Sequence, residues 1–200
     1  MEPRYLPLMM VVLFLIVVVV GRVGIQLASV GDSGIRPGSR LKSTKEIFIS
    51  YLMFGTLVVQ LLLTSLYSIR LIEPHIKLGE LGIWIGVFFC ISGILFASYS
   101  QLAMGNNWRI GVDPEEKTEL VTSGIYSKIR NPIYTACIFH GFGILLLAPN
   151  TLIIISGLIG FFAIRAYVRD IEEPYLIGLH GEKYLRYIET TGSFLPRLRN

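Results

Sequence analysis

The segment LVTSGIYSKIRNPIY, Leu120 to Tyr134, lies in the longest polar stretch of a chain that is otherwise mostly apolar. Long apolar runs precede it. A pair of apolar runs follows it and leads to a second polar segment, RDIEEPYLIGLHGEKYLRY, Arg169 to Tyr187. We expect these two polar segments to meet and to form the functional site.

The composition is that of an integral membrane protein. Hydrophobic residues make up 52% of the 200 residues and charged residues only 16%, against about 25% charged in a typical soluble domain, and the mean hydropathy is +0.61. Each crossing needs about 20 apolar residues, which leaves no room for a separate soluble domain. The net charge of +4 comes without a basic patch interleaved with aromatic residues, so we expect membrane lipid as the partner and no nucleic acid.

Five apolar runs predict an all-α fold with about five transmembrane helices, over residues 6–30, 47–69, 81–104, 132–148 and 151–170. A cleaved signal peptide is the alternative for the first run, because Arg4 precedes it. The length of that run and the lack of a nearby small-x-small motif favour a membrane helix. Ser43 or Thr44 can cap the second helix, and Pro132 can open the fourth, where its missing N–H is not needed.

The basic residues predict the orientation of these helices. If the five helices alternate, fourteen of the 18 lysines and arginines fall on one side of the membrane and three on the other. Since the basic side usually faces the cytoplasm, we expect the N-terminus outside and both polar segments and the C-terminus in the cytoplasm. Residues 1–104 then hold three helices, and residues 105–200 hold a loop, a helical hairpin and a tail that together form the catalytic region.

The end of the first polar segment has the features of an anion site. Asn131 can cap a helix that starts at Pro132, and the free N–H groups of a first helical turn attract a carboxylate. The alternative is that Arg130 anchors the chain at the membrane interface, with Tyr126 and Tyr134 in an aromatic belt. The residues alone leave both interpretations open.

In the second polar segment and just before it, Arg165, Arg169 and Glu173 are spaced four residues apart, so they lie near one face if the helix continues. An ordinary interfacial ion pair between Arg169 and Glu173 is the alternative, and such a pair contributes only a few tenths of a kcal/mol. Pro174 should kink or restart the helix, because it removes a donor and clashes with a carbonyl one turn earlier.

The histidines and cysteines do not predict a metal centre. Cys90 and Cys137 lie in apolar runs, and no histidine has a cysteine or carboxylate partner at ligand spacing. His140 stands alone in an apolar run. We expect it to hydrogen-bond within the helix bundle, with a titrating role as the alternative.

The ordered motifs L-V-T-S-G-I-Y, R-N-P-I-Y, an apolar hairpin, E-E and G-E-K-Y-L-R-Y resemble the isoprenylcysteine carboxyl methyltransferase family, which is related to the phospholipid methyltransferases. The resemblance runs from Trp108 onward, and the first three helices share with the family only their apolar character. It implies a membrane methyltransferase that uses S-adenosylmethionine to esterify the carboxylate of an isoprenylated cysteine. Separately, we expect the protein to be a monomer.

The resemblance also implies the roles of individual residues. The cofactor would be bound by Thr118, Glu119, Leu120, Val121, Tyr126, Asn131, Pro132, Ile133, Tyr134, Glu172 and Glu173. An arginine upstream of the glutamate pair is assigned to the substrate carboxylate, which makes Arg169 and Arg165 the candidate catalytic residues. Asn131 stands where the family usually has histidine, so hydrogen bonding is retained there but proton transfer is not.

Two other functions remain open at this point. One is a methyltransferase that acts on a phospholipid amine or another small lipid, which would keep the cofactor residues but need no arginine for a carboxylate. The other is a membrane scaffold without enzymatic activity. For the leading function, the acceptor carboxylate is already ionised at neutral pH, so positioning and desolvation would supply most of the rate.

Overall fold

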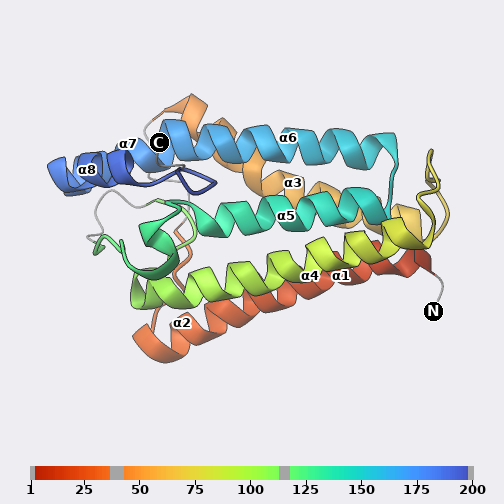
Figure 1. Cartoon of the computed structure of the whole chain (residues 1–200), viewed down its shortest axis with the longest axis horizontal. Helices are drawn as coiled ribbons and strands as arrows, with labels where there is room; N and C mark the ends of the chain where they lie inside the picture. Colours follow the sequence, from red (N-terminus) through yellow and green to blue (C-terminus); the bar gives the residue numbers. More distant parts are fainter. Residues whose placement is uncertain (1–2, 37–42, 113–117, 198–200) are drawn as a thin grey trace.

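The computed structural model describes residues 3–36, 43–112 and 118–197, and these form a bundle of helices (Figure 1). The α-helices are α1 (Leu6–Phe14), α2 (Arg22–Val30), α3 (Thr44–Ser68), α4 (Gly79–Met104), α5 (Pro132–Leu147), α6 (Thr151–Tyr167), α7 (Glu173–His180) and α8 (Glu182–Thr190). The shorter 3-10 and π segments are η1 (Pro3–Tyr5), η2 (Leu15–Gly21), η4 (Gly105–Asn107), η5 (Gly124–Ser127) and η6 (Val168–Glu172). The predicted all-α membrane fold is confirmed.

Among the residues that the structure describes, four continuous helices are long and apolar enough to cross a membrane, namely Leu6–Val30, Thr44–Ser68, Gly79–Asn107 and Thr151–His180. The fifth apolar helix, α5, has only 16 residues, slightly fewer than the usual minimum of about 17. In Figure 1 the start of α5 lies inward of the ends of its neighbours α4 and α7. The loop before α5 and the helices α7 and α8 lie at this end of the bundle.

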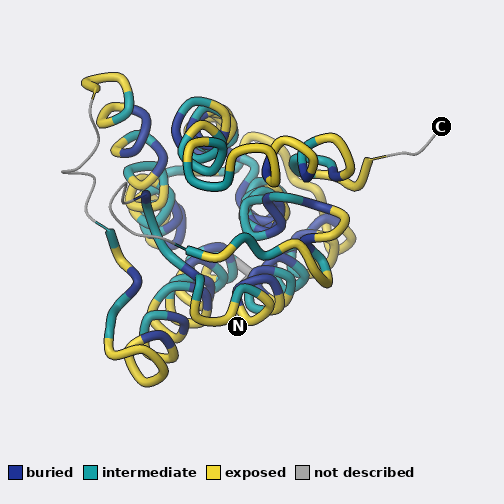
Figure 2. Tube along the Cα trace, turned by 90° about the vertical axis from the view of Figure 1, so that its left-hand side faces the viewer, coloured by how far each residue is buried: buried dark blue, intermediate teal, exposed yellow. Residues whose placement is uncertain are grey.

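The outer surface of the bundle is apolar, as a lipid environment requires. Tyr51, Leu81 and Trp84 are each at least 70% exposed on the outward faces of α3 and α4. Figure 2, which views the bundle along its length, shows buried positions turned toward the interior and exposed positions turned outward. An exposed apolar surface of this extent is typical of a membrane-facing one.

Glycines allow α4 and α5 to pack at close range. A Cβ atom at Gly143 would lie 2.6 Å from the Sγ of Cys90 and 2.6 Å from the carbonyl oxygen of Gly86. A Cβ at Gly93 would lie 2.8 Å from the carbonyl oxygen of Ala136. Small residues at helix contacts are how membrane helices gain van der Waals packing without a hydrophobic driving force, and here they fix α5 against α4.

The start of α3 and the end of α6 are set by local sequence. Ser43 caps α3 as expected: its Oγ accepts the backbone N–H of Glu46, and the carboxylate of Glu46 accepts the backbone N–H of Ser43. After α6 the helix widens into the π segment η6, in which the N–H of Glu173 bonds to the carbonyl of Val168, five residues back. Pro174 then occupies the first turn of α7, so the predicted interruption takes the form of a π turn.

Candidate active site

A cavity lies at the start of α5, lined by residues of the loop before α5 and of η6, α7 and α8. Its lining residues are Met104, Asn107, Thr118, Glu119, Leu120, Val121, Tyr126, Arg130, Asn131, Pro132, Ile133, Tyr134, Glu172, Leu176, Tyr184 and Tyr187. Ten of the eleven residues that the sequence suggested for the cofactor are among them, and Glu173 is not. The two polar segments therefore meet here. We call this space the polar cavity.

Tyr126 and Tyr187 tie the loop before α5 to the rest of the bundle. The hydroxyl of Tyr126 donates to the carbonyl of Ser100 on α4 at 3.1 Å, and the hydroxyl of Tyr187 donates to the carbonyl of Tyr126 at 2.6 Å. Burial raises the pKa of Tyr126 and raises the pKa of Tyr187 to about 12. Both phenols are therefore neutral donors at physiological pH.

Arg130 joins the loop before α5 to the C-terminal segment. Its Nε and Nη2 atoms donate to Oε1 of Glu173 at 3.2 and 3.0 Å, and its Nη1 donates to the carbonyl of Thr191 at 2.6 Å. The side chain of Arg130 is only 9% exposed. Glu173 is therefore the partner of Arg130, which lines the polar cavity, and Glu173 does not line the cavity itself.

Asn131 does not cap α5, contrary to the expectation from sequence. Its Nδ2 donates to the hydroxyl of Ser193 at 3.1 Å, and its backbone N–H donates to the carbonyl of the same residue at 3.0 Å. The reason is tertiary, because residues after α8 run back beside this turn and pair Ile129 with Gly192 in a parallel bridge. The early N–H groups of α5, at Ile133 and Tyr134, consequently have no side-chain cap among the described residues.

Glu172 contributes a carboxylate to the wall of the polar cavity. Tyr134 of α5 lines the same cavity. The Oε2 atom of Glu172 is shielded from solvent and has no hydrogen-bond partner among the residues that the structure describes. Because an unpaired buried carboxylate oxygen is costly, this atom points to a positively charged or hydrogen-bond-donating ligand.

Neither candidate arginine lines the polar cavity. Arg169 has a side chain 76% exposed and donates to the neighbouring Asp170 at 2.5 and 3.0 Å, while Lys45 contacts the same carboxylate at 3.0 Å. Arg165 is exposed and lies over the ring of Phe161 at 5.8 Å. A continuous α-helix would align both arginines with Glu173, but η6 turns less per residue than an α-helix and breaks that alignment.

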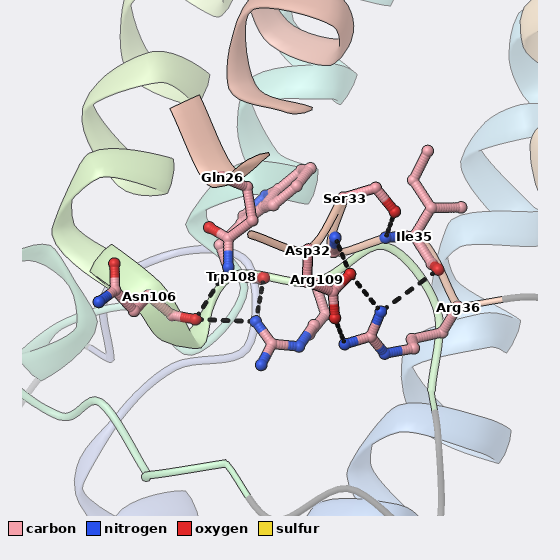
Figure 3. A network of polar contacts seen from close by, with 9 residues as sticks. Gln26, Asp32, Ser33, Ile35, Arg36, Asn106, Trp108 and Arg109 are labelled. Atoms are coloured by element: carbon pink, nitrogen blue, oxygen red, sulfur yellow. Dashed lines mark hydrogen bonds and ion pairs between the residues drawn. The ribbon is translucent and has the colours of Figure 1, made fainter. Parts of the chain in front are cut away.

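The wall formed by the end of α4 is held by the N-terminal helix. The Nε2 of Gln26 donates to the carbonyl of Asn106 at 3.0 Å, as Figure 3 shows. The guanidinium of Arg22, which is buried, donates to the carbonyl of Gly105 and lies 5.0 Å from the ring of Trp108. In the same turn, Oδ1 of Asn107 accepts the backbone N–H of Glu119 at 3.0 Å. Both residues line the polar cavity, so the contacts of Arg22 and Gln26 support one of its walls.

Several lining residues escaped the sequence-based prediction. Tyr184 and Tyr187 are spaced as neighbours on one face of α8, and their burial follows from that amphipathic pattern. The pattern alone did not connect them to the loop before α5. Met104 and Asn107 carry no signal in a single sequence, since only the anchoring of η4 against α2 turns them toward the cavity.

A second, larger cavity of about 240 Å³ lies deeper in the bundle, between α1, η2, α3, α5 and α6. Most of its lining is apolar, and we call it the apolar cavity. It follows the polar cavity along α5, because Tyr134 lines the first and Cys137, one turn later, lines the second. The rings of Tyr134 and Tyr167, 6.3 Å apart, lie near this boundary.

Metal ligands are not gathered at either cavity. Among the described residues, no three His, Cys, Asp or Glu side chains lie close enough together to hold a metal ion.

Comparison with known proteins finds similarity to methyltransferases. The family model described as phospholipid methyltransferase matches residues 81–183, which is just over half of the chain. A curated relative, the protein-S-isoprenylcysteine O-methyltransferase of Xenopus laevis, is 28% identical over 117 residues. That match covers 58% of this chain and 41% of the relative, so the chain spans well under half of the relative's length.

The fold is also found in a solved structure. The eukaryotic intramembrane Ras methyltransferase, an isoprenylcysteine carboxyl methyltransferase, superposes with a TM-score of 0.56 at 20% sequence identity. The superposition covers 88% of this chain and 60% of the other. The two proteins therefore share an architecture, and the resemblance noted in the sequence is confirmed.

Proposed function

This chain belongs to the phospholipid methyltransferase family, and from that premise we propose that it transfers a methyl group from S-adenosylmethionine to the carboxylate of an isoprenylated cysteine in the membrane. The observation that carries the proposal is that ten of the suggested cofactor residues line one cavity, and that α5, which contributes to it, also lines an apolar cavity about one turn later. The curated relative that acts on S-isoprenylcysteine supports the choice of acceptor.

The polar cavity fits the amino-acid part of the proposed cofactor. Glu172 offers an unpaired carboxylate oxygen to a positively charged group. The N–H groups of Ile133 and Tyr134, in the first turn of α5, lack a side-chain cap and suit a carboxylate. An ammonium and a carboxylate on one ligand would satisfy both. S-adenosylmethionine would supply the reactive methyl group, and Thr118 to Val121, Tyr126 and Asn131 would line the remainder of its site.

The apolar cavity fits the lipid part of the acceptor. It opens between helices whose outward faces are apolar, so a lipid chain can reach it without passing through water. The boundary at Tyr134 would then bring the end of that chain next to the polar cavity.

Arg165 is the better candidate of the two arginines for the acceptor carboxylate. Phe161, over which its guanidinium lies, and the adjacent Ile164 both line the apolar cavity. Arg169 is directed to Asp170 instead. An arginine can hold a carboxylate with two parallel hydrogen bonds, which fixes its direction. The acceptor needs no general base, so the residues of this chain act by orienting it and excluding water.

A methyl-transfer assay in membranes tests the proposal. With methyl-labelled cofactor and a farnesylcysteine-type acceptor, we expect label that base releases as methanol, which identifies an ester. The control acceptor has an amide in place of the carboxylate and should take up no label. Base-stable label in extracted lipid would instead identify a phospholipid amine as acceptor, as the family's name suggests. Absence of cofactor binding by calorimetry would favour a scaffold.

A further inference from the structure

An apolar groove runs along the outside of the bundle between α3 and α6. Its lining residues fall between positions 48 and 52 of α3 and between positions 155 and 166 of α6, and all of them are apolar. Phe48 and Phe162 are 64% and 63% exposed, so the groove faces the surrounding lipid. We call it the outer groove. Of its lining residues only Leu158 also lines the apolar cavity, so the outer groove is a distinct space.

Charged side chains lie at one end of the outer groove. Lys45 precedes Phe48 by one turn of α3, and Arg169 and Asp170 follow Ala166 by about one turn. These side chains meet, because the Nζ of Lys45 lies 3.0 Å from Oδ2 of Asp170 and Nη2 of Arg169 donates to the same oxygen at 3.0 Å. The apolar groove therefore leads to a cluster of two cations around one carboxylate.

The two cations of this cluster face outward and the carboxylate does not. The side chains of Lys45 and Arg169 are 70% and 76% exposed, whereas that of Asp170 is 15% exposed. Since both cations contact the same Oδ2 atom, Nζ of Lys45 and Nη2 of Arg169 lie no more than about 6 Å apart. One phosphate group can accept from two donors at this separation, because charge-assisted hydrogen bonds reach about 2.8 Å from each side.

The other charged residues near this cluster leave it positive. Arg165 is exposed one turn before Arg169 and adds a cation. Glu46 is also exposed, but its carboxylate accepts the backbone N–H of Ser43 and so turns back to the start of α3. An anion that approaches along the outer groove thus meets exposed cations first.

The length of the outer groove fits the acyl chain of a phospholipid. Ala166 follows Ile155 by eleven residues, which is about 16 Å at 1.5 Å per residue. One leaflet of the hydrocarbon core is about 15 Å thick. The charged cluster comes about 5 Å further on, after one more helical turn. This is where the headgroup of a phospholipid lies when its chain occupies the groove.

We propose that the outer groove is a binding site for an anionic phospholipid, whose phosphate accepts from Lys45 and Arg169 and whose acyl chain lies between α3 and α6. A zwitterionic headgroup would bring its own ammonium close to these cations, so the cluster favours a headgroup with net negative charge. We expect this end of the bundle in the cytoplasm, and cytoplasmic leaflets carry anionic phospholipids. The inference is independent of the proposed function, since it uses neither cavity.

Fluorescence quenching measures lipid preference at this groove alone. In a Trp84→Phe background, Phe162→Trp places the reporter in the outer groove. Tyr99→Trp is the matched control, because it lies five residues before the end of α4, as Phe162 does before the end of α6. The purified full chain is reconstituted in mixtures of phosphatidylglycerol and phosphatidylcholine in which one or the other carries brominated chains. Trp108 is buried and contributes the same background to both proteins.

The measured quantity is the affinity for phosphatidylglycerol relative to phosphatidylcholine. For Phe162→Trp we expect a ratio of about five or more, the effect of one basic residue near an anionic lipid. For Tyr99→Trp we expect a ratio of about one. Adding Lys45→Gln and Arg169→Gln to the groove reporter should bring its ratio close to one.

A second pair of substitutions separates a local effect from a change in net charge. Lys183→Gln with Arg186→Gln removes the same charge from exposed positions of α8 and should leave the ratio at the groove unchanged. If Phe162→Trp does not fold, Phe48→Trp on the opposite wall takes its place. A ratio of about one at the groove in the protein with both cations would show bulk lipid without preference and overturn the inference. A preference that survives the loss of both cations would overturn it as well.

Discussion

The hydroxyl of Tyr187 donates to the backbone carbonyl of Tyr126, 61 residues earlier in the chain, at 2.6 Å. Tyr126 in turn donates to Ser100 on α4. The last helix is thereby connected through one loop to the middle of the bundle. Since both tyrosines line the polar cavity, the shape of that cavity depends on this contact.

We expect Tyr187→Phe to lower the free energy of unfolding by about 1 kcal/mol or somewhat more, because it leaves a buried carbonyl without its partner. The matched control is Tyr184→Phe, on the same face of α8, whose hydroxyl makes no hydrogen bond within the described residues. Thermal unfolding in detergent measures both. An equal loss in the two variants would show that ring packing, not the hydrogen bond, holds α8 in place.

Glu172→Gln should weaken S-adenosylmethionine binding by about tenfold or more, the effect of losing a hydrogen bond between charged groups. Glu173→Gln should change this affinity little and instead lower thermal stability, because Glu173 pairs with Arg130. Calorimetry and thermal unfolding on both variants separate the two roles. A reversal of this pattern would assign the cofactor to Glu173.

Arg165→Ala should reduce kcat/KM for a carboxylate acceptor by a factor on the order of 10 to 100, corresponding to one charge-assisted contact. Cofactor affinity should stay unchanged. Arg169→Ala should change kcat/KM by no more than about twofold, as expected for the loss of an exposed ion pair. Kinetics with the farnesylcysteine-type acceptor decide, and a larger loss in the Arg169 variant would return the carboxylate to that residue.

Arg22→Met should lower cofactor affinity several-fold although Arg22 is outside the polar cavity. The variant removes the donor to Gly105 and the stacking on Trp108, so the turn that carries Asn107 loses its support. The net loss of stability should be about 1–3 kcal/mol. Arg22→Lys keeps the charge and can restore the donor, so it should fall between wild type and Arg22→Met in calorimetry.

Gly143→Ala should destabilise the bundle by about 1–3 kcal/mol, the usual effect of overpacking. The new methyl group would meet the Sγ of Cys90 and the backbone of Gly86 at 2.6 Å. Gly141→Ala on the same helix is the control, since a Cβ there meets nothing within 4 Å. Thermal unfolding should show a lower midpoint for the first variant and little change for the second.

The sequence predicted the helices well, because their signal is local. The predicted helices over 47–69, 81–104 and 132–148 begin and end within three residues of α3, α4 and α5, whereas the last continues to His180, ten residues past its predicted end. The motifs also named most residues that line the polar cavity. Their roles toward a cofactor stay predictions.

What the sequence could not provide depends on tertiary contacts. The π turn at η6 changes the directions of Arg165 and Arg169 relative to Glu173, and no periodic pattern in the sequence reveals such a turn. Asparagine is a preferred residue for capping a helix, but the side chain of Asn131 donates to Ser193 instead, because the chain after α8 returns to this turn. The close contact of Gly143 with α4 likewise exists only once the two helices are paired.

The shortness of α5 has an energetic meaning for a lipid-modifying enzyme. Extracting a lipid chain from hydrocarbon into water costs about 0.8 kcal/mol for every methylene group. Because α5 starts inward of the end of α4 (Figure 1), the residues of α5 that line the two cavities also lie inward of that end. Under the proposed function, the acceptor would meet its reaction partner while its tail stays immersed, and the enzyme would bring the water-soluble reagent down to the lipid.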